Sequence, residues 1–259
     1  MGLLPLSLNR YTEFPVDARS MGAPIMRRAD SLKRFYLLMD TLEERVAGMR
    51  RLSDCSGRMP WPKRGVYFFF EPGEIRTGSG TGPRVVRIGT HALKAGSMTT
   101  LWRRLSQHRG QVRSGGGNHR SSIFRLVMGT ALMERDGIGC ATWDNRRIAA
   151  SRAVRESEIA LERVVSKVIG DMPFLWLAVE DEPGPDSMRG YIERNAIALL
   201  SSHGKEAIDP PSTSWLGRKC NREKVRIAGL WNSNHVDENC DPAFLDTLAT
   251  LVEQVEKSK

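Results

Sequence analysis

Alternating residues predict a first strand at residues 65–70, GVYFFF. Aromatic and β-branched side chains favour an extended backbone, and the turn-prone Glu-Pro-Gly that follows ends the run. Successive side chains of a strand point to opposite faces, so Tyr67 and Phe69 share one face. The other face carries Val66, Phe68 and Phe70.

A second strand is predicted at residues 84–89, RVVRIG, after a long polar and glycine-rich loop. The alternation puts Val86 and Ile88 on one face and Val85 and Arg87 on the other. The two strands together predict a hairpin, in which we expect Tyr67 to lie opposite Arg87.

Apolar residues spaced three and four apart predict helices in several further segments. The first begins at an N-cap formed by Asp30 and Ser31, and the last begins at Asp241-Pro242. Between them lie helices at about 98–109, 151–169 and 188–200, a buried element of undetermined type at 121–133, and an exposed excursion at 134–147. Residues 173–179, PFLWLAV, form a nearly continuous apolar run, which is typical of a central strand buried on both faces.

The helix at 98–109 carries the first candidate chemistry. Ser97 and Gly110 bracket it as caps, and its apolar arc consists of Met98, Leu101 and Leu105. Arg104 and His108 fall together along one edge of that arc, one turn apart, whereas Arg103 points away from it. An Arg and a His at this spacing are usually solvated, but a place on the border of the core favours a functional role.

Glu193 is the most unusual carboxylate, because it falls inside the apolar arc of the helix at 188–200. An ionised carboxylate buried without a partner costs several kcal/mol, so this position requires a cation, an arginine or a cleft. Arg189 and Arg194 are possible structural partners on the same helix. Glu158 also falls inside an apolar arc and is the rival candidate.

The charge of the chain is concentrated in one block. The formal net charge is +9 and the isoelectric point is near 9.7. Residues 84–152 contain thirteen Lys or Arg and three acids, so the rest of the chain is close to neutral. This distribution favours a nucleic-acid partner, although a solvated arginine-rich surface would give the same count. The sequence shows neither a signal peptide nor a transmembrane run, so we expect a cytoplasmic protein that does not bind membranes.

These features, taken in order, resemble the GIY-YIG nuclease family. Gly65-Val66-Tyr67 is similar to the first signature, and Arg87-Ile88-Gly89 to the second, with Arg in place of the usual Tyr. The segment RLSQH, from Arg104 to His108, resembles the Arg and His helix of the family, and Glu193 resembles its metal-binding glutamate.

The resemblance implies an α+β fold. Its small central sheet would have three strands, mainly antiparallel and flanked by helices, with helical extensions at both ends. We expect an N-terminal arm and helix at 1–63, a nuclease domain at 64–205 with an insertion around 110–170, and a C-terminal extension at 206–259 packed on the core. Within the first part, residues 1–29 are predicted to form the arm.

The resemblance also implies a mechanism of phosphodiester hydrolysis. Glu193 would hold one Mg²⁺ or Mn²⁺ ion, and Tyr67 would act as the general base on a water molecule. Arg87 and Arg104 would favour the phenolate form of Tyr67, and Arg104 would also bind the scissile phosphate. His108, His91 or His119 would hydrogen-bond Tyr67 or relay its proton. Taken alone, His119 is expected at the surface or at a phosphate.

The expected substrate is double-stranded DNA, bound by a monomer or a homodimer. Basic residues on the helix and the following loop are expected to contact phosphates, namely Arg103, Arg109, Arg113 and Arg120. The alternative is a catalytically weak nucleic-acid-binding relative, in which Arg87 records lost activity. The family commonly has a late Asn, for which the candidates are Ser212, Ser214, Asn232 and Asn234.

Overall fold

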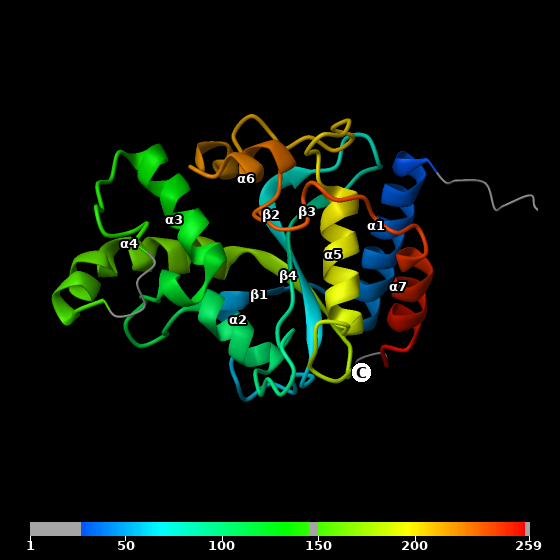
Figure 1. Cartoon of the computed structure of the whole chain (residues 1–259), viewed down its shortest axis with the longest axis horizontal. Coiled ribbons are helices and arrows are strands. Elements are labelled where there is room, and N and C mark those ends of the chain that lie inside the picture. Colours follow the sequence, from blue (N-terminus) through cyan, green and yellow to red (C-terminus); the bar gives the residue numbers. More distant parts are fainter. Residues whose placement is uncertain (1–26, 146–149, 257–259) are drawn as a thin grey trace, which may run out of the picture.

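A four-stranded antiparallel sheet forms the centre of the computed structural model, which describes residues 27–145 and 150–256 (Figure 1). The strands are β1 (Arg50–Arg51), β2 (Gly65–Ile75), β3 (Pro83–Gly89) and β4 (Pro173–Ala178), in the spatial order β1-β4-β2-β3. The predicted α+β class is confirmed, and the short β1 adds a strand at one edge. The arm predicted for residues 1–29 lies mostly outside the described residues.

The register of the hairpin differs from the prediction. Tyr67 lies opposite Gly89, and Arg87 lies opposite Phe69. The register shifts between Phe69 and Phe70, and this β-bulge places one extra residue in β3. Val86 therefore packs in the same cluster as Tyr67, whereas Val85 and Ile88 pack in the other. The expected opposition of Tyr67 and Arg87 is wrong by two residues, because the connecting loop sets the register of a hairpin. The expected pairing of faces in β3 is wrong because simple alternation does not anticipate a bulge.

Seven α-helices of the described chain surround the sheet. They are α1 (Arg28–Arg45), α2 (Leu101–Arg109), α3 (Ile123–Asp136), α4 (Arg152–Asp171), α5 (Met188–Leu200), α6 (Glu223–Ala228) and α7 (Phe244–Glu253). Short 3₁₀ turns are η1 (Leu52–Asp54), η2 (His119–Ser121) and η3 (Leu216–Lys219). The element of undetermined type is thus the helix α3. The predicted excursion after it, at 134–147, is described as far as residue 145; most of this part is exposed, but Trp143 is fully buried.

Two predicted helix starts are wrong by a few residues. Helix α1 begins at Arg28, ahead of the expected cap. Helix α2 begins at Leu101, because the side chain of Thr100 accepts a hydrogen bond from the Arg103 amide and caps the helix. Met98 therefore lies outside the helix and is 79% exposed.

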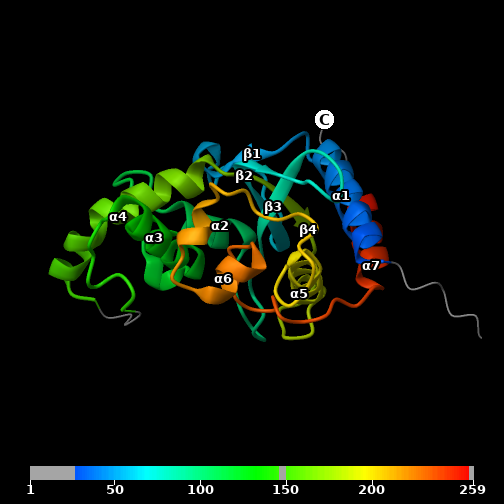
Figure 2. The same cartoon turned by 90° about the horizontal axis from the view of Figure 1, so that it is seen from above.

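The helices cover the two faces of the sheet as separate layers (Figures 1 and 2). Helices α1, α5 and α7 form one hydrophobic cluster with the Phe68 face of β2. Helices α2, α3 and α4 form the other with the Tyr67 face. β4 contributes side chains to both, which confirms its prediction as a central strand. No helix in the described parts of the chain is long and apolar enough to cross a membrane.

Candidate active site

A pocket of about 640 Å³ lies where the end of β3, helix α2, helix α5 and the C-terminal tail meet. Arg87, Arg104 and Glu193 line it, as the sequence predicted for one site. The loop after β3 adds His91 and Lys94. With one carboxylate among several cations, the pocket suits an anionic ligand.

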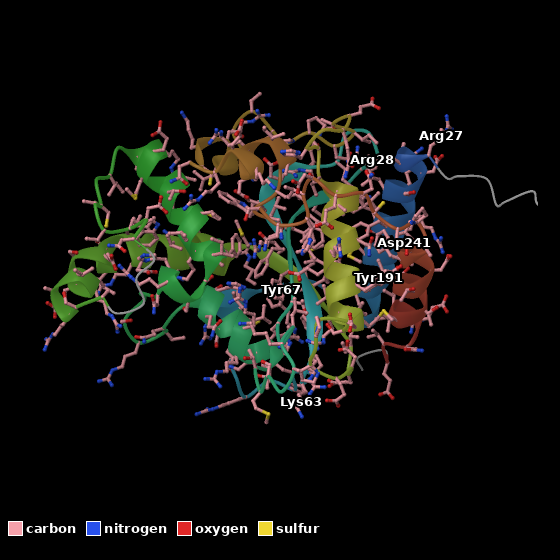
Figure 3. The ribbon with its side chains drawn as sticks, viewed as in Figure 1. Arg27, Arg28, Lys63, Tyr67, Tyr191 and Asp241 are labelled. Carbon is pink, nitrogen blue, oxygen red and sulfur yellow. The ribbon has the colours of Figure 1, made fainter. Side chains whose placement is uncertain are left out.

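Tyr67 and His108 do not line the pocket, but they contact each other and interact electrostatically with its lining residues Arg87 and Arg104. The Tyr67 hydroxyl is 2.8 Å from Nε2 of His108, and both side chains are fully buried. Figure 3 shows Tyr67 between the sheet and the helices that cover this face. Among the three histidines proposed as partners of Tyr67, His108 is the one that makes this hydrogen bond. Burial lowers the pKa of His108 well below its ordinary value, and Arg104, Arg87 and Arg125 add to the effect, so the imidazole is neutral.

Gly89 has a steric reason to be glycine. A Cβ atom at this position would lie 2.2 Å from the Tyr67 hydroxyl oxygen and 2.3 Å from its Cζ atom. The register that puts Tyr67 opposite Gly89 therefore needs a residue without a side chain.

We expect Gly89→Ala to destabilise the fold by roughly 1–3 kcal/mol, because the buried tyrosine ring must move to admit the methyl group. Urea unfolding measures this loss. Gly139→Ala is the control, since a Cβ there meets nothing within 4 Å. Equal unfolding midpoints for the two variants would contradict the close packing of Tyr67 on Gly89.

Arg87 is 6% exposed and is held by the C-terminal tail. Its guanidinium donates a hydrogen bond to the main-chain oxygen of Trp231 and lies 5.2 Å from the centre of the Phe124 ring. Burial lowers the pKa of Arg87, whereas Tyr67 and Glu193 act in the opposite direction. Arg87 thus interacts electrostatically both with Tyr67, outside the pocket lining, and with Glu193, which lines the pocket.

Arg104 is partly exposed and reaches the pocket from α2. Its Nη1 atom donates to Oε1 of Gln107 at 3.0 Å and to the main-chain oxygen of Ser121 at 3.2 Å. These acceptors orient the guanidinium without neutralising it. Arg103 is exposed on the outer side of α2, as predicted.

Glu193 is half-buried in the pocket wall. Its Oε1 accepts a hydrogen bond from the Thr90 amide at 3.2 Å. Burial raises the pKa of Glu193, while Arg87, His235 and Arg104 oppose the rise. The structural partners considered for it are engaged elsewhere, Arg189 with Asp181 and Arg194 with Glu238.

The residues around Glu193 fit a divalent cation that keeps its water ligands. Mg²⁺ is commonly bound through one or two carboxylates together with substrate phosphates and waters. Among the residues that the structure describes, no three His, Cys, Asp or Glu side chains form a metal cage. Glu193 would therefore contribute one oxygen ligand, and the pocket has room for waters.

His91 is 5% exposed and lines the same pocket. Its Nδ1 atom lies 2.9 Å from the Thr99 main-chain oxygen, so Nδ1 carries the proton and donates it. The Nε2 lone pair is buried and has no partner within the described residues. Burial is the main reason that the pKa of His91 is lowered to about 4. The positive charges of Arg189, Arg104 and Arg64 lower it further.

The neutral His91 makes the stability of the protein depend on pH. Its pKa is 6.5 when exposed and about 4 in the fold, so the unfolded chain binds more protons between these values. Stability is therefore complete above pH 6.5 and falls as the pH drops toward 4. We expect His91→Gln to lose less stability than wild type between about pH 7.5 and about pH 5 in urea unfolding. Equal losses would show that His91 is not protected from protonation.

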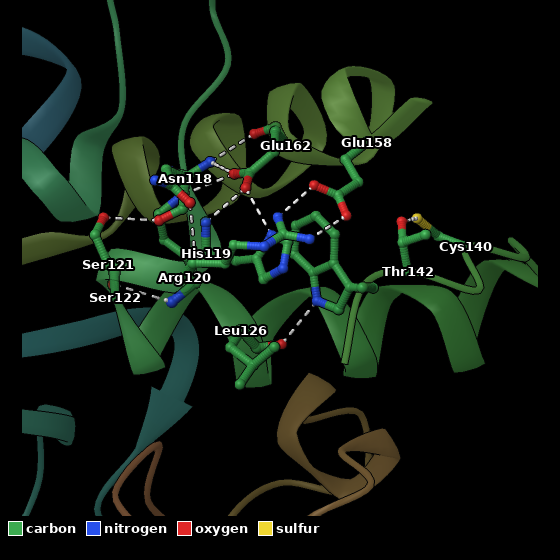
Figure 4. A network of polar contacts seen from close by, with 12 residues as sticks. Asn118, His119, Arg120, Ser121, Ser122, Leu126, Cys140, Thr142, Glu158 and Glu162 are labelled. Atoms are coloured by element: carbon green, nitrogen blue, oxygen red, sulfur yellow. Dashed lines mark hydrogen bonds and ion pairs between the residues drawn. The ribbon is translucent and has the colours of Figure 1, made fainter. Parts of the chain in front are cut away.

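His119 lies outside the pocket, in a buried network between α3 and α4 (Figure 4). It is 1% exposed, stacks on Trp143 at 4.0 Å, and donates from Nδ1 to Glu162 at 2.9 Å. The expectation of a surface position is wrong, because Glu162 provides a buried acceptor. Glu158, the rival carboxylate, pairs with Arg120 in the same network.

The arginines predicted to contact phosphates occupy different environments. Arg113 is exposed, like Arg103. The Arg109 guanidinium donates to the Cys55 main-chain oxygen and lies 4.9 Å from the Trp102 ring centre. The Arg120 side chain is 5% exposed and engaged by Glu158.

The C-terminal tail supplies pocket residues, of which Asn232 and Asn234 were candidates for the late Asn of the family and His235 was not anticipated. Trp231 donates its amide to the Val86 oxygen at 2.7 Å, and Asn232 bonds both main-chain groups of Ile88. The tail thus covers the free edge of β3, and Asn232, Asn234 and His235 line the pocket. Ser212 instead bonds Glu74, and Ser214 bonds Ser212. The polar run WNSNH was the available signal, but nothing in it indicated pairing with β3.

These elements define an α+β domain in which a small antiparallel sheet, an Arg and His helix and a Glu helix surround a cationic pocket. The sequence model of the GIY-YIG domain matches residues 26–258. The chain therefore belongs to the GIY-YIG family, a family of nucleases that act on nucleic acids. Comparisons with curated proteins and with solved structures give no match.

Proposed function

We propose that this protein is a metal-dependent endonuclease that hydrolyses phosphodiester bonds of double-stranded DNA. The observation that supports this most directly is that Arg87, Arg104 and Glu193 line one pocket, while the hydrogen-bonded pair Tyr67 and His108 interacts with Arg87 and Arg104. Residues from β2, β3, α2 and α5 contribute to this arrangement. A structural role alone would not require a carboxylate and several cations around one open space.

Each residue has a defined part in the proposed reaction. Arg104 binds the scissile phosphate, because its guanidinium is oriented but not paired with an acid. Arg87 adds positive charge beside Tyr67, as the residue that stands for the second family tyrosine. Glu193 would hold Mg²⁺ or Mn²⁺, which neutralises charge on the leaving oxygen when bound.

Tyr67 is the proposed general base. A proton passes from the attacking water to the Tyr67 oxygen, the new phosphorus–oxygen bond forms, and the bond to the leaving oxygen breaks. His108 holds the Tyr67 hydroxyl at 2.8 Å and does not face the substrate itself.

A second candidate is a nucleic-acid-binding protein that cuts weakly. The observation that favours it is the complete burial of Tyr67, which does not line the pocket. In this case Arg87 would block the path between the tyrosine and a bound phosphate.

Nicking of supercoiled plasmid in the presence of Mg²⁺ or Mn²⁺ decides between the two. We expect wild type to cut and Tyr67→Phe to lose activity by a factor of about 10²–10⁴, which is the usual contribution of a general base. The phenylalanine keeps the ring that packs on Gly89. Salt-dependent binding of DNA by wild type without any cutting would reject the nuclease and support the binding protein.

A further inference from the structure

The Tyr67–His108 pair continues to a third residue, Ser122. Nδ1 of His108 lies 2.8 Å from the Ser122 hydroxyl oxygen. Ser122 is also the N-cap of α3, where its Oγ accepts a hydrogen bond from the Arg125 amide at 3.3 Å. Tyr67 and His108 are 0% exposed and Ser122 is 1% exposed, so solvent does not compete for these groups.

The direction of these hydrogen bonds follows from counting protons. A neutral imidazole carries one N–H and one lone pair, and either nitrogen can hold the proton. If Ser122 donates to Nδ1, then Nε2–H donates to the Tyr67 oxygen. If Tyr67 donates to Nε2, then Nδ1–H donates to Ser122.

The two directions are not equivalent once Tyr67 is ionised. With a neutral phenol, each direction leaves one hydroxyl proton without an acceptor among the described residues. When Ser122 donates to His108, the Tyr67 proton has no acceptor. When Tyr67 donates to His108, the Ser122 proton has none. With a phenolate, the first direction leaves none, because Ser122 accepts from Arg125 and donates to His108 while His108 donates to Tyr67. Arg87 lies close enough to Tyr67 for the two side chains to interact electrostatically.

We propose that Ser122 is a positioning residue that holds His108 as the Nε2–H tautomer, so that His108 donates to the phenolate of Tyr67. The inference rests on the proposed role of Tyr67 as general base. Charged groups from several elements face Tyr67 and His108. They are Arg87 of β3, Arg104 of α2 and Arg125 of α3, and Glu193 of α5 acts on Arg87. Ser122 supplies the donor direction that this row of hydrogen bonds requires.

Removing the serine hydroxyl removes the donor to Nδ1. In Ser122→Ala nothing donates to Nδ1, so the Nε2–H tautomer with a phenolate also leaves one buried group unpaired. That state loses its advantage over the one in which Nε2 accepts from a neutral phenol. Ser122→Thr keeps both the hydroxyl and the helix cap. The matched control is Ser151→Ala, which removes the cap of α4 at an exposed residue away from His108.

The test is NMR of the whole protein as the pH is raised. The ¹⁵N shifts of His108 report its tautomer, and the ¹³Cζ shift of Tyr67 reports its ionisation; His108→Gln identifies the signals among the five histidines. In wild type, we expect Tyr67 to ionise together with the Nε2–H tautomer. In Ser122→Ala, the phenolate fraction at a fixed pH falls by up to about tenfold, as expected for the loss of one buried hydrogen bond. Ser122→Thr and Ser151→Ala should behave as wild type.

The inference is overturned if His108 of the ionised wild type carries its proton on Nδ1, or if Ser122→Ala leaves the ionisation of Tyr67 unchanged. Cleavage provides a separate reading, because the rising limb of the pH–rate profile should move to higher pH in Ser122→Ala alone. Wild type that cuts DNA while Ser122→Ala keeps its profile rejects the role of Ser122 and leaves the nuclease in place. Wild type that never cuts rejects the nuclease, whereas the NMR result still decides the direction of the hydrogen bonds.

Discussion

Glu193→Gln is expected to abolish cleavage while the protein stays folded. Glutamine has nearly the same shape, and its amide oxygen can still accept from the Thr90 amide. Its charge is lost, so the proposed Mg²⁺ or Mn²⁺ ion loses its one carboxylate ligand. Because metal stabilisation of developing charge contributes several kcal/mol, we expect the rate to fall by at least about a thousandfold.

Metal binding gives a reading of this variant that does not depend on activity. Mn²⁺ should raise the melting temperature of wild type, since an ion that binds only the folded state stabilises it, and it should have little effect on Glu193→Gln. Glu253→Gln, at an exposed position of α7, is the control that changes the same charge away from the pocket. Equal responses of wild type and Glu193→Gln to Mn²⁺ would show that Glu193 is not the metal ligand.

Arg125→Leu is expected to cause the largest loss of stability. Arg125 is fully buried; its Nε donates to Oε2 of Glu162 at 2.9 Å, and its Nη1 donates to the His108 main-chain oxygen at 2.8 Å. Burial alone would raise the pKa of Glu162, but hydrogen bonds from His119 and the charge of Arg125 hold it below its ordinary value. Removing one partner of a buried pair leaves an uncompensated charge and costs about 3–5 kcal/mol.

Urea unfolding of four proteins tests this expectation. Arg125→Leu combined with Glu162→Gln should recover part of the loss, because the double variant no longer buries an unpaired carboxylate. Arg135→Leu is the control on the same helix, where a half-exposed arginine pairs with Asp136 and should contribute less than about 1 kcal/mol. A loss in Arg125→Leu as small as that of the control would mean that the network between α3 and α4 is not an important source of stability.

The basic block at residues 84–152 contains more arginines than the surface offers to a nucleic acid. Four arginines of the basic block, Arg84, Arg87, Arg120 and Arg125, have side chains that the structure buries or nearly buries. Arg84 pairs with Glu74, and Arg120 and Arg125 pair with Glu158 and Glu162 of α4. A count along the chain cannot separate such internal pairs from free surface charge, because the partners come from other elements. Among the described residues of this block, Arg104 and the exposed arginines are the ones whose guanidinium groups are accessible to phosphate.

Local periodicity by itself determined most of the elements and several side-chain positions. Alternation in β2 correctly separated Tyr67 and Phe69 from the Phe68 face. The helical spacing correctly placed Arg104 at the border of the core and Glu193 in a partly buried position of α5. These features depend on the geometry of a single strand or helix, which the sequence of that segment fixes.

Only the tertiary structure decided how these residues meet. The register of the hairpin put Tyr67 opposite Gly89, and the tail brought Trp231 to Arg87 and His235 into the pocket. Ser122 meets His108 only because α3 packs against α2 and β2. Register, edge pairing and buried ion pairs join segments far apart in the chain, so their outcome depends on the packing of the whole core and not on the pattern of any one segment.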